Sequence, residues 1–199
     1  RTRDRGASRR PKSRDRRPTL SFVALLLTCL LGSQPNLFGQ ELAKRGGTGG
    51  FRIRVNLPLT GSADQLIKQM VQRVVEQQSG GPDRGVLVLE FWPAAGTEGR
   101  GTEFERALSL ARYLTSEDLQ RVRTVAYVPR AAIGHAVLVA LACEEIIMDS
   151  DAVLGDAGID ESAIGPTMRG GYTEIARSRR TIPEAMALGM LDAELQVSR

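Results

Sequence analysis

The clearest secondary-structure pattern in the chain lies in Val125–Gly158, VAYVPRAAIGHAVLVALACEEIIMDSDAVLGDAG. Val125–Val128 is rich in β-forming residues and stops at a proline, which predicts a strand. Ala131–Ala142 is small and apolar on nearly all sides, so as a helix it would be buried. Ile146–Met148 then restarts a strand before a Ser-Asp turn. The segment therefore predicts a strand, a buried helix and a second strand in direct succession.

The sequence before this segment alternates in the same way. Gly85–Glu90 is an apolar run of strand length, which is typical of a strand buried on both faces. We expect strands at residues 51–55, 85–90 and 122–128, and helices at residues 62–78 and 104–114. The alternation predicts an α/β fold with a mostly parallel sheet, right-handed crossovers and helices packed on the sheet.

The last part of the chain has a weaker pattern. Residues 158–171 are glycine-rich and predict a loop, and Tyr172–Arg180 predicts a short basic helix. Thr181 is a candidate N-cap, and Pro183 in the following turn favours a helix that runs to Leu188.

The first 40 residues have the pattern of an export signal. Arg1–Pro18 holds nine Lys or Arg residues against two acidic ones, and Leu20–Leu31 follows as twelve uncharged, mostly apolar residues. A bilayer span needs about 20 such residues, whereas a signal peptide needs fewer. Residues 1–40 are therefore expected to be a signal peptide, with an uncleaved N-terminal anchor as the alternative. The protein would be exported, and periplasmic or membrane-associated.

The net charge of +4 does not indicate nucleic-acid binding. Outside Arg1–Pro18 there are 18 basic and 21 acidic residues, so the remainder has a net charge of −3. Residues 41–50 form a glycine-rich linker, and residues 51–199 are expected to form one folded domain. We therefore expect no nucleic-acid partner.

Two motifs resemble the ClpP/crotonase superfamily. Ala140–Ile146, ALACEEI, resembles the end of the active-site helix and the start of the next strand in membrane-associated serine proteases of the NfeD and signal-peptide-peptidase type. Thr181–Asp192, TIPEAMALGMLD, resembles the ending of crotonase and Clp-type domains. The resemblance covers about residues 53–192 and implies a ClpP/crotonase-like fold.

The resemblance also implies where a catalytic dyad would lie. The family's nucleophilic serine falls on Gly134, and glycine cannot attack a carbonyl. The general base in NfeD-type relatives is a lysine beyond the second strand, but the last lysine here is Lys68. That region carries Arg169, Arg177, Arg179 and Arg180 instead, and arginine does not give up its proton. Both members of a Ser–Lys dyad are therefore missing at the matching positions.

An oxyanion loop is the third element that the resemblance implies. The family's glycine-rich loop after the buried strand supplies backbone N–H groups that stabilise a negative oxygen. Here Pro93 is kept, Ala94 and Ala95 replace a glycine pair, and Gly96 follows. The alternative is a solvent-exposed loop anchored by Trp92.

Other candidate residues are few. His135, the only histidine, would sit in the first turn of the buried helix, as a substitute acid or base, a ligand contact, or a packed and hydrogen-bonded residue. Cys143 is expected in the core, and Ser162 lies in a loop without a paired base. One histidine and scattered carboxylates predict no metal site, and no cofactor is expected.

These observations favour a non-catalytic relative of the NfeD and Clp-type proteases that binds peptides or serves in assembly. Its partner would be a peptide or a membrane-protein segment, and it would form a homo-oligomer. Two alternatives stay open. One is an active serine endopeptidase with a different nucleophile, and the other is a crotonase-type acyl-CoA enzyme.

Overall fold

The computed structural model describes residues 50–78 and 83–195. The expected signal or anchor, and all but the last residue of the expected linker, lie outside the described residues. Within the described part, no helix is both long enough and apolar enough to span a bilayer.

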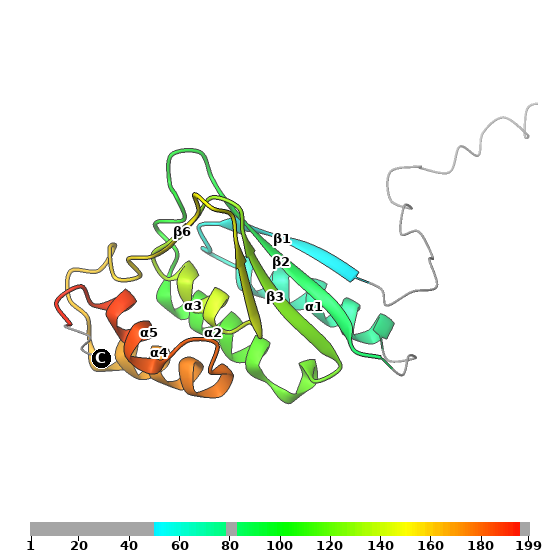
Figure 1. The fold of residues 1–199 in the computed structure, drawn as a ribbon. Helices are drawn as coiled ribbons and strands as arrows, with labels where there is room; N and C mark the ends of the chain where they lie inside the picture. Colours follow the sequence, from blue (N-terminus) through cyan, green and yellow to red (C-terminus); the bar gives the residue numbers. More distant parts are fainter. Residues whose placement is uncertain (1–49, 79–82, 196–199) are drawn as a thin grey trace, which may run out of the picture. The chain divides into compact units, whose positions relative to one another are not determined.

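A four-stranded parallel sheet forms the centre of the domain (Figure 1). Its order is β1 (Gly50–Leu57), β2 (Gly85–Pro93), β3 (Val122–Val128) and β5 (Glu145–Met148), and each neighbouring pair is parallel. The predicted α/β class with a mostly parallel sheet is therefore confirmed. Gly50, expected in the linker, is the first residue of β1 and lies opposite Val86.

Helices pack on one face of this sheet. Figure 1 shows α1 (Ala63–Gln78), α2 (Phe104–Thr115) and α3 (Ala136–Leu141) on the same face. On that face Leu87 and Leu89 of β2 are fully buried, whereas Val86 and Val88 on the other face keep partial exposure. The expected burial of β2 on both faces is therefore only partly met, because the described helices cover one face.

The Val125–Gly158 segment differs from its prediction in one place. The expected helix over residues 131–142 begins instead as a strand, β4 (Ala131–Ile133), which pairs in parallel with β6 (Val153–Gly155). A turn at Gly134 follows, with φ +72°, and only then does α3 begin. Residues 131–133 are extended because their backbone groups have partners on both sides. On one side β4 pairs with β6. On the other side the Ile133 N–H donates to the carbonyl of Glu98.

The helix itself is buried as predicted. All six residues of α3 are at most 1% exposed. Its C-terminal carbonyls, and those of α2, are orphaned groups that need donors. The Arg179 guanidinium supplies them, because it donates to the carbonyl of Ala142 at 2.8 Å and to that of Leu114.

The two C-terminal helices differ from the prediction in their bounds: the first begins earlier than expected, and the second ends later. α4 spans Pro166–Arg179, so it begins six residues before the expected helix and removes part of the expected loop. Arg180, with φ +58°, ends it. α5 spans Glu184–Leu191, and Thr181 does not cap it, because the Thr181 hydroxyl donates to the carbonyl of Cys143 at 2.8 Å.

Candidate functional site

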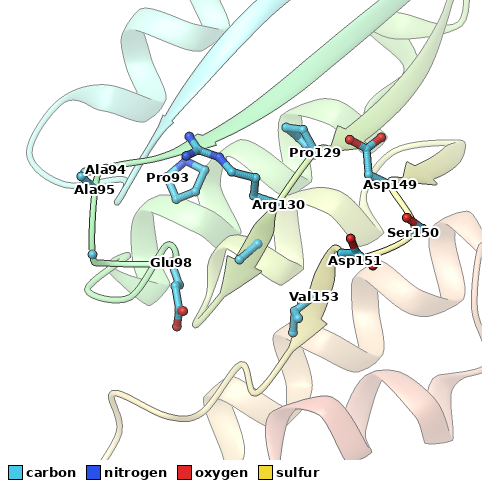
Figure 2. Close-up of a pocket in the computed structure, with 12 residues that line it drawn as sticks. Pro93, Ala94, Ala95, Glu98, Pro129, Arg130, Asp149, Ser150, Asp151 and Val153 are labelled. Carbon is cyan, nitrogen blue, oxygen red and sulfur yellow. The ribbon is translucent and has the colours of Figure 1, made fainter.

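A cleft of about 710 Å³ lies at the carboxyl ends of β2, β3 and β5 (Figure 2). It is lined by residues 93–96, 98, 129–131, 149–151 and 153. Three chain segments meet there because parallel strands end at the same edge of the sheet. Open α/β sheets bind ligands in this position, so the cleft is the first candidate site.

The loop expected to supply oxyanion donors forms one wall of the cleft. The Thr97 N–H donates to the Ala94 carbonyl at 3.1 Å, which closes a turn, and Gly96 has φ +76°. A type II turn requires a positive φ at this third residue, so glycine is needed. The Ala94 N–H is bonded to the carbonyl of Leu57. Within the described part of the chain, the N–H groups of Ala95 and Gly96 have no acceptor.

Trp92 organises two arginines beside this loop. The guanidinium carbons of Arg54 and Arg130 each lie 4.5 Å from the centroid of its ring. Arg54 is also 3.6 Å from the Glu90 carboxylate. Arg130 lines the cleft and has no acidic group within 4.0 Å among residues 50–78 and 83–195. Stacking on an aromatic ring restrains a guanidinium while its in-plane donors stay available. Arg130 is therefore a positioned, uncompensated cation.

The opposite wall has the opposite charge. Asp149 and Asp151 lie across the cleft from the Ala94–Ala95 corner, as Figure 2 shows. The Tyr127 hydroxyl donates to Asp149 Oδ1 at 3.0 Å, and this bond to a carboxylate raises the pKa of Tyr127. Val153 adds an apolar side chain that is 52% exposed. Glu98 lies on the loop side, so acidic groups line both sides of the cleft. The cleft thus combines these acids with Arg130 near the loop and one exposed apolar side chain.

Gly134 does not line this cleft. It is buried, and a Cβ added to it would lie 3.0 Å from Asp160 Oδ2 and 3.7 Å from Arg100 Cα. Its N–H donates to the carbonyl of Asp156 at 3.2 Å, so it is not free to bind an oxyanion. The structure therefore does not bring the matching nucleophile position and the 93–96 loop into one cleft, because residues 98–101 cover Gly134.

His135 also lies away from the cleft, in a buried hydrogen-bond network. Its Nδ1 is 3.2 Å from the Tyr172 hydroxyl, its Nε2 is 3.0 Å from Glu161 Oε1, and the Phe104 ring meets it edge-on. A neutral ring satisfies both contacts, because the tyrosine can donate to Nδ1 and Nε2–H can donate to the carboxylate. Burial, and next the Glu161 charge, raise the pKa of Tyr172. This environment matches the packed, hydrogen-bonded alternative.

The cysteine and serine candidates do not make a nucleophile either. Cys143 is fully buried, and burial raises the pKa of its thiol to about 12, so it stays protonated. Ser162 lines a second cleft of about 390 Å³, together with Glu161 and Arg169. Glu161 is already bonded to His135, so it is not positioned as a base for Ser162.

The arginines that stand where the family carries a lysine are mostly engaged. Three are held by ion pairs: Arg169 by Asp192 at 2.5 Å, Arg177 by Glu184 at 2.7 Å and Arg179 by Glu144 at 3.8 Å. Arg180 occupies the left-handed position that ends α4. The first two pairs join α4 to α5 and the residue after it, and the Arg179 pair reaches the residue before β5.

The structure also shows a Ser–Lys contact that the sequence reasoning missed. Lys68 Nζ donates to Ser109 Oγ at 2.6 Å, and the Ser109 hydroxyl donates to the fully buried Asp64 at 3.1 Å. Arg106 lies 3.7 Å from the same carboxylate. Because the ammonium is the donor and the hydroxyl proton goes to Asp64, Ser109 has no base. The i, i+4 spacing of Asp64 and Lys68 indicates from sequence that the two side chains can meet on one helix. Their contact with Ser109 on α2 depends on tertiary packing, so nothing in the sequence indicates it.

Comparison with known proteins leaves the family open. A scan against family models finds no match to this chain, and a search of curated proteins finds none. The function proposed below therefore rests on the cleft and on the resemblance in the sequence.

Proposed function

We propose that residues 51–199 form a non-catalytic peptide-binding domain of ClpP/crotonase-like fold, closest to the NfeD-type serine proteases. The observation that carries the proposal is the cleft at the carboxyl edge of the sheet, which lies apart from Gly134. Its volume of about 710 Å³ falls in the usual range for ligand sites. The family part is supported by the ALACEEI and TIPEAMALGMLD motifs, and by a buried α3 that leads directly into β5.

β6 offers a strand edge beside the cleft, although Val153 is the only one of its residues that lines the cleft itself. The only partner of β6 in the described part of the chain is β4, so its other edge is unpaired there. The Val153 N–H donates to the Arg130 carbonyl at 2.8 Å, toward β4. Backbone groups alternate along a strand, so those of Leu154 point to the open edge. An extended peptide can add to such an edge through main-chain hydrogen bonds.

The chemistry of the candidate residues supports the proposed absence of catalysis. Acyl transfer needs a nucleophile, a base within hydrogen-bond reach and an oxyanion site. The cleft offers two N–H donors, at Ala95 and Gly96, but Gly134 is buried outside it. Ser150, the serine that lines the cleft, has neither histidine nor lysine among the other lining residues. A bound peptide would therefore be held without being cut.

Peptide capture by the full chain tests the proposal. Immobilised protein is exposed to a pool of random hexapeptides, and the retained peptides are quantified by mass spectrometry. Val153→Glu should abolish retention, because it replaces the exposed apolar side chain of β6 in the cleft with a charge beside Asp149 and Asp151. Met186→Glu is the matched control, since Met186 is 47% exposed on α5 and does not line the cleft.

Two other readouts separate the alternatives. A serine-reactive fluorophosphonate should not label the protein, and labelling would show that it is an active serine hydrolase. Acetyl-CoA should neither bind nor compete with peptides. If it binds and the peptide pool does not, the acyl-CoA alternative replaces the proposal.

Export is a separate part of the proposal, supported by the basic and apolar segments of residues 1–40. A fusion of residues 1–45 to a reporter that is active only outside the cytoplasm should be active. Replacing Leu26 and Leu27 by arginine should abolish this, because each arginine opposes insertion by about 2.5–3.5 kcal/mol. Equal activity of both fusions would contradict export through this segment.

A further inference from the structure

We infer that the part of the cleft around Arg130 binds a free C-terminal carboxylate, so that the domain recognises the ends of peptide chains. This inference rests on the proposed peptide-binding function and specifies its ligand. Three observations carry it: the uncompensated Arg130, the two unbonded N–H groups of the 93–96 loop, and the opposite charge of the far wall.

Arg130 has the properties of a carboxylate receptor. Its guanidinium is restrained by the Trp92 ring at 4.5 Å, and Figure 2 shows it reaching from the end of β3 toward Pro93. A planar guanidinium can give a carboxylate two parallel hydrogen bonds. Arg54 contacts the same ring but is 3.6 Å from Glu90 and does not line the cleft. Of these two arginines, Arg130 is the one placed to bind a ligand.

The loop supplies the second set of donors. Figure 2 shows Arg130 extending toward the side of the cleft where Ala95 lies, and Gly96 is the next residue in the chain. The N–H groups of Ala95 and Gly96 have no acceptor within the described residues. Successive backbone N–H groups in a turn favour an anion, and such groups capture terminal carboxylates in peptide-recognition domains. A carboxylate has two oxygens, so one can face Arg130 while the other faces the loop.

The far wall sets the direction of the peptide. Asp149 and Asp151 face the cleft opposite the loop, and Glu98 lines it on the loop side; all three would repel a carboxylate. This leaves Arg130 and the two unbonded N–H groups of the loop as the favourable place for it. The two aspartates favour peptide N–H groups or a basic side chain upstream of the terminus. The exposed Val153 lies on the same side as the aspartates and can contact an apolar residue of the bound peptide.

Three peptide pools test the inference with the full chain. All are N-acetylated hexapeptides of random sequence without Asp or Glu, except where stated: one pool ends in a free carboxylate, one ends in an amide, and one ends in an amide and carries a fixed internal glutamate. The carboxylate pool should be retained about tenfold better than either amide pool, which is the scale of a hydrogen bond to a charged group. Arg130→Gln should remove this preference, and Arg130→Lys should keep part of it, since lysine retains charge without the bidentate geometry.

Arg54→Gln is the matched control, because it changes the same residue type on the same ring and should keep the preference. Equal retention of all pools, with loss in Val153→Glu, would leave peptide binding standing and overturn the carboxylate inference. No retention of any pool would instead overturn the proposed function. Retention of the internal-glutamate pool at the level of the carboxylate pool would show that the cleft binds acidic side chains rather than chain ends, which also overturns the inference.

Discussion

Placing a serine at Gly134 should destabilise the domain without creating an enzyme. Gly134 has φ +72°, and the left-handed conformation costs a residue with a Cβ roughly 1–2 kcal/mol. The new Cβ would also lie 3.0 Å from Asp160 Oδ2, which accepts a hydrogen bond from the Gly101 N–H at 2.6 Å. Displacing that carboxylate weakens a charge-assisted bond. We expect Gly134→Ser to lower the free energy of unfolding by about 2–3 kcal/mol.

Urea unfolding measures this loss. With m about 2 kcal/mol/M, the midpoint should fall by about 1 M or slightly more, with m unchanged. Gly170→Ser is the matched control, because Gly170 lies in α4, has no positive φ, and a Cβ added there meets nothing within 4 Å. It should be neutral or slightly stabilising.

A double-mutant cycle separates the two causes. In an Asp160→Ala background, Gly134→Ser should cost about 1 kcal/mol less, because the steric part disappears while the backbone part stays. A loss below 0.5 kcal/mol for Gly134→Ser in the wild-type background would refute the left-handed turn. Fluorophosphonate labelling of the Gly134→Ser variant would show that position 134 is open to substrates, contrary to its burial.

Three further predictions concern groups outside the cleft. Arg179→Ala should lower the free energy of unfolding by about 3 kcal/mol in denaturant titration, because charged donors to two helix-end carbonyls are lost; the exposed Arg177→Ala is the control and should change little. Cys143 keeps its proton in the folded state up to a pKa of about 12, whereas the unfolded thiol ionises near 8.5. Stability should therefore fall by about 1.4 kcal/mol per pH unit above pH 9, and this part of the slope, measured between pH 9 and 10, should be absent in Cys143→Ala. Ser109→Ala should cost about 1–3 kcal/mol, because Asp64 loses a donor. A serine-directed label on Ser109 in the folded protein would contradict its structural role.

The sheet and its helices could be predicted because their residues face different environments. In β1, buried Ile53 and Val55 alternate with exposed Arg52 and Arg54. This alternation shows that one face of the strand is covered and the other is open to solvent. Helical spacing was less decisive. In α1 the helical spacing puts Leu66 on the same apolar stripe as Ile67, yet Leu66 is 58% exposed whereas Ile67 is buried. Periodicity gives the axis of an apolar stripe, not its width.

The start of the buried helix could not be read from hydrophobicity. Residues 131–142 are almost uniformly apolar, so the pattern has no period that separates strand from helix. The signal that was available is Gly134, a glycine inside an apolar run. It marks the boundary between β4 and α3 through its positive φ.

The cleft was predictable in position but not in chemistry. The resemblance implies an oxyanion loop at residues 93–96, with an exposed loop anchored by Trp92 as the alternative. Residues 94–96 are exposed, and the loop lines the cleft. Arg130 was not singled out, because its contact with Trp92 depends on how side chains turn at the ends of two neighbouring strands. Both residues do lie at strand ends, in β2 and just after β3, on the edge of the sheet where ligands bind.

The proposed carboxylate site and the proposed lack of a nucleophile are consistent with each other. An endopeptidase creates a new C-terminal carboxylate at every turnover, so a cleft that binds this group well would retain its product. Catalysis also gains nothing from contacts that hold the ground state as tightly as the transition state. A domain that only binds peptides has no product to release and no transition state to stabilise. Each contact to the bound chain end therefore lengthens the residence time of the peptide. The cation at Arg130 would therefore be a disadvantage in a protease with this cleft, and an advantage in a protein that holds peptide ends without cutting them.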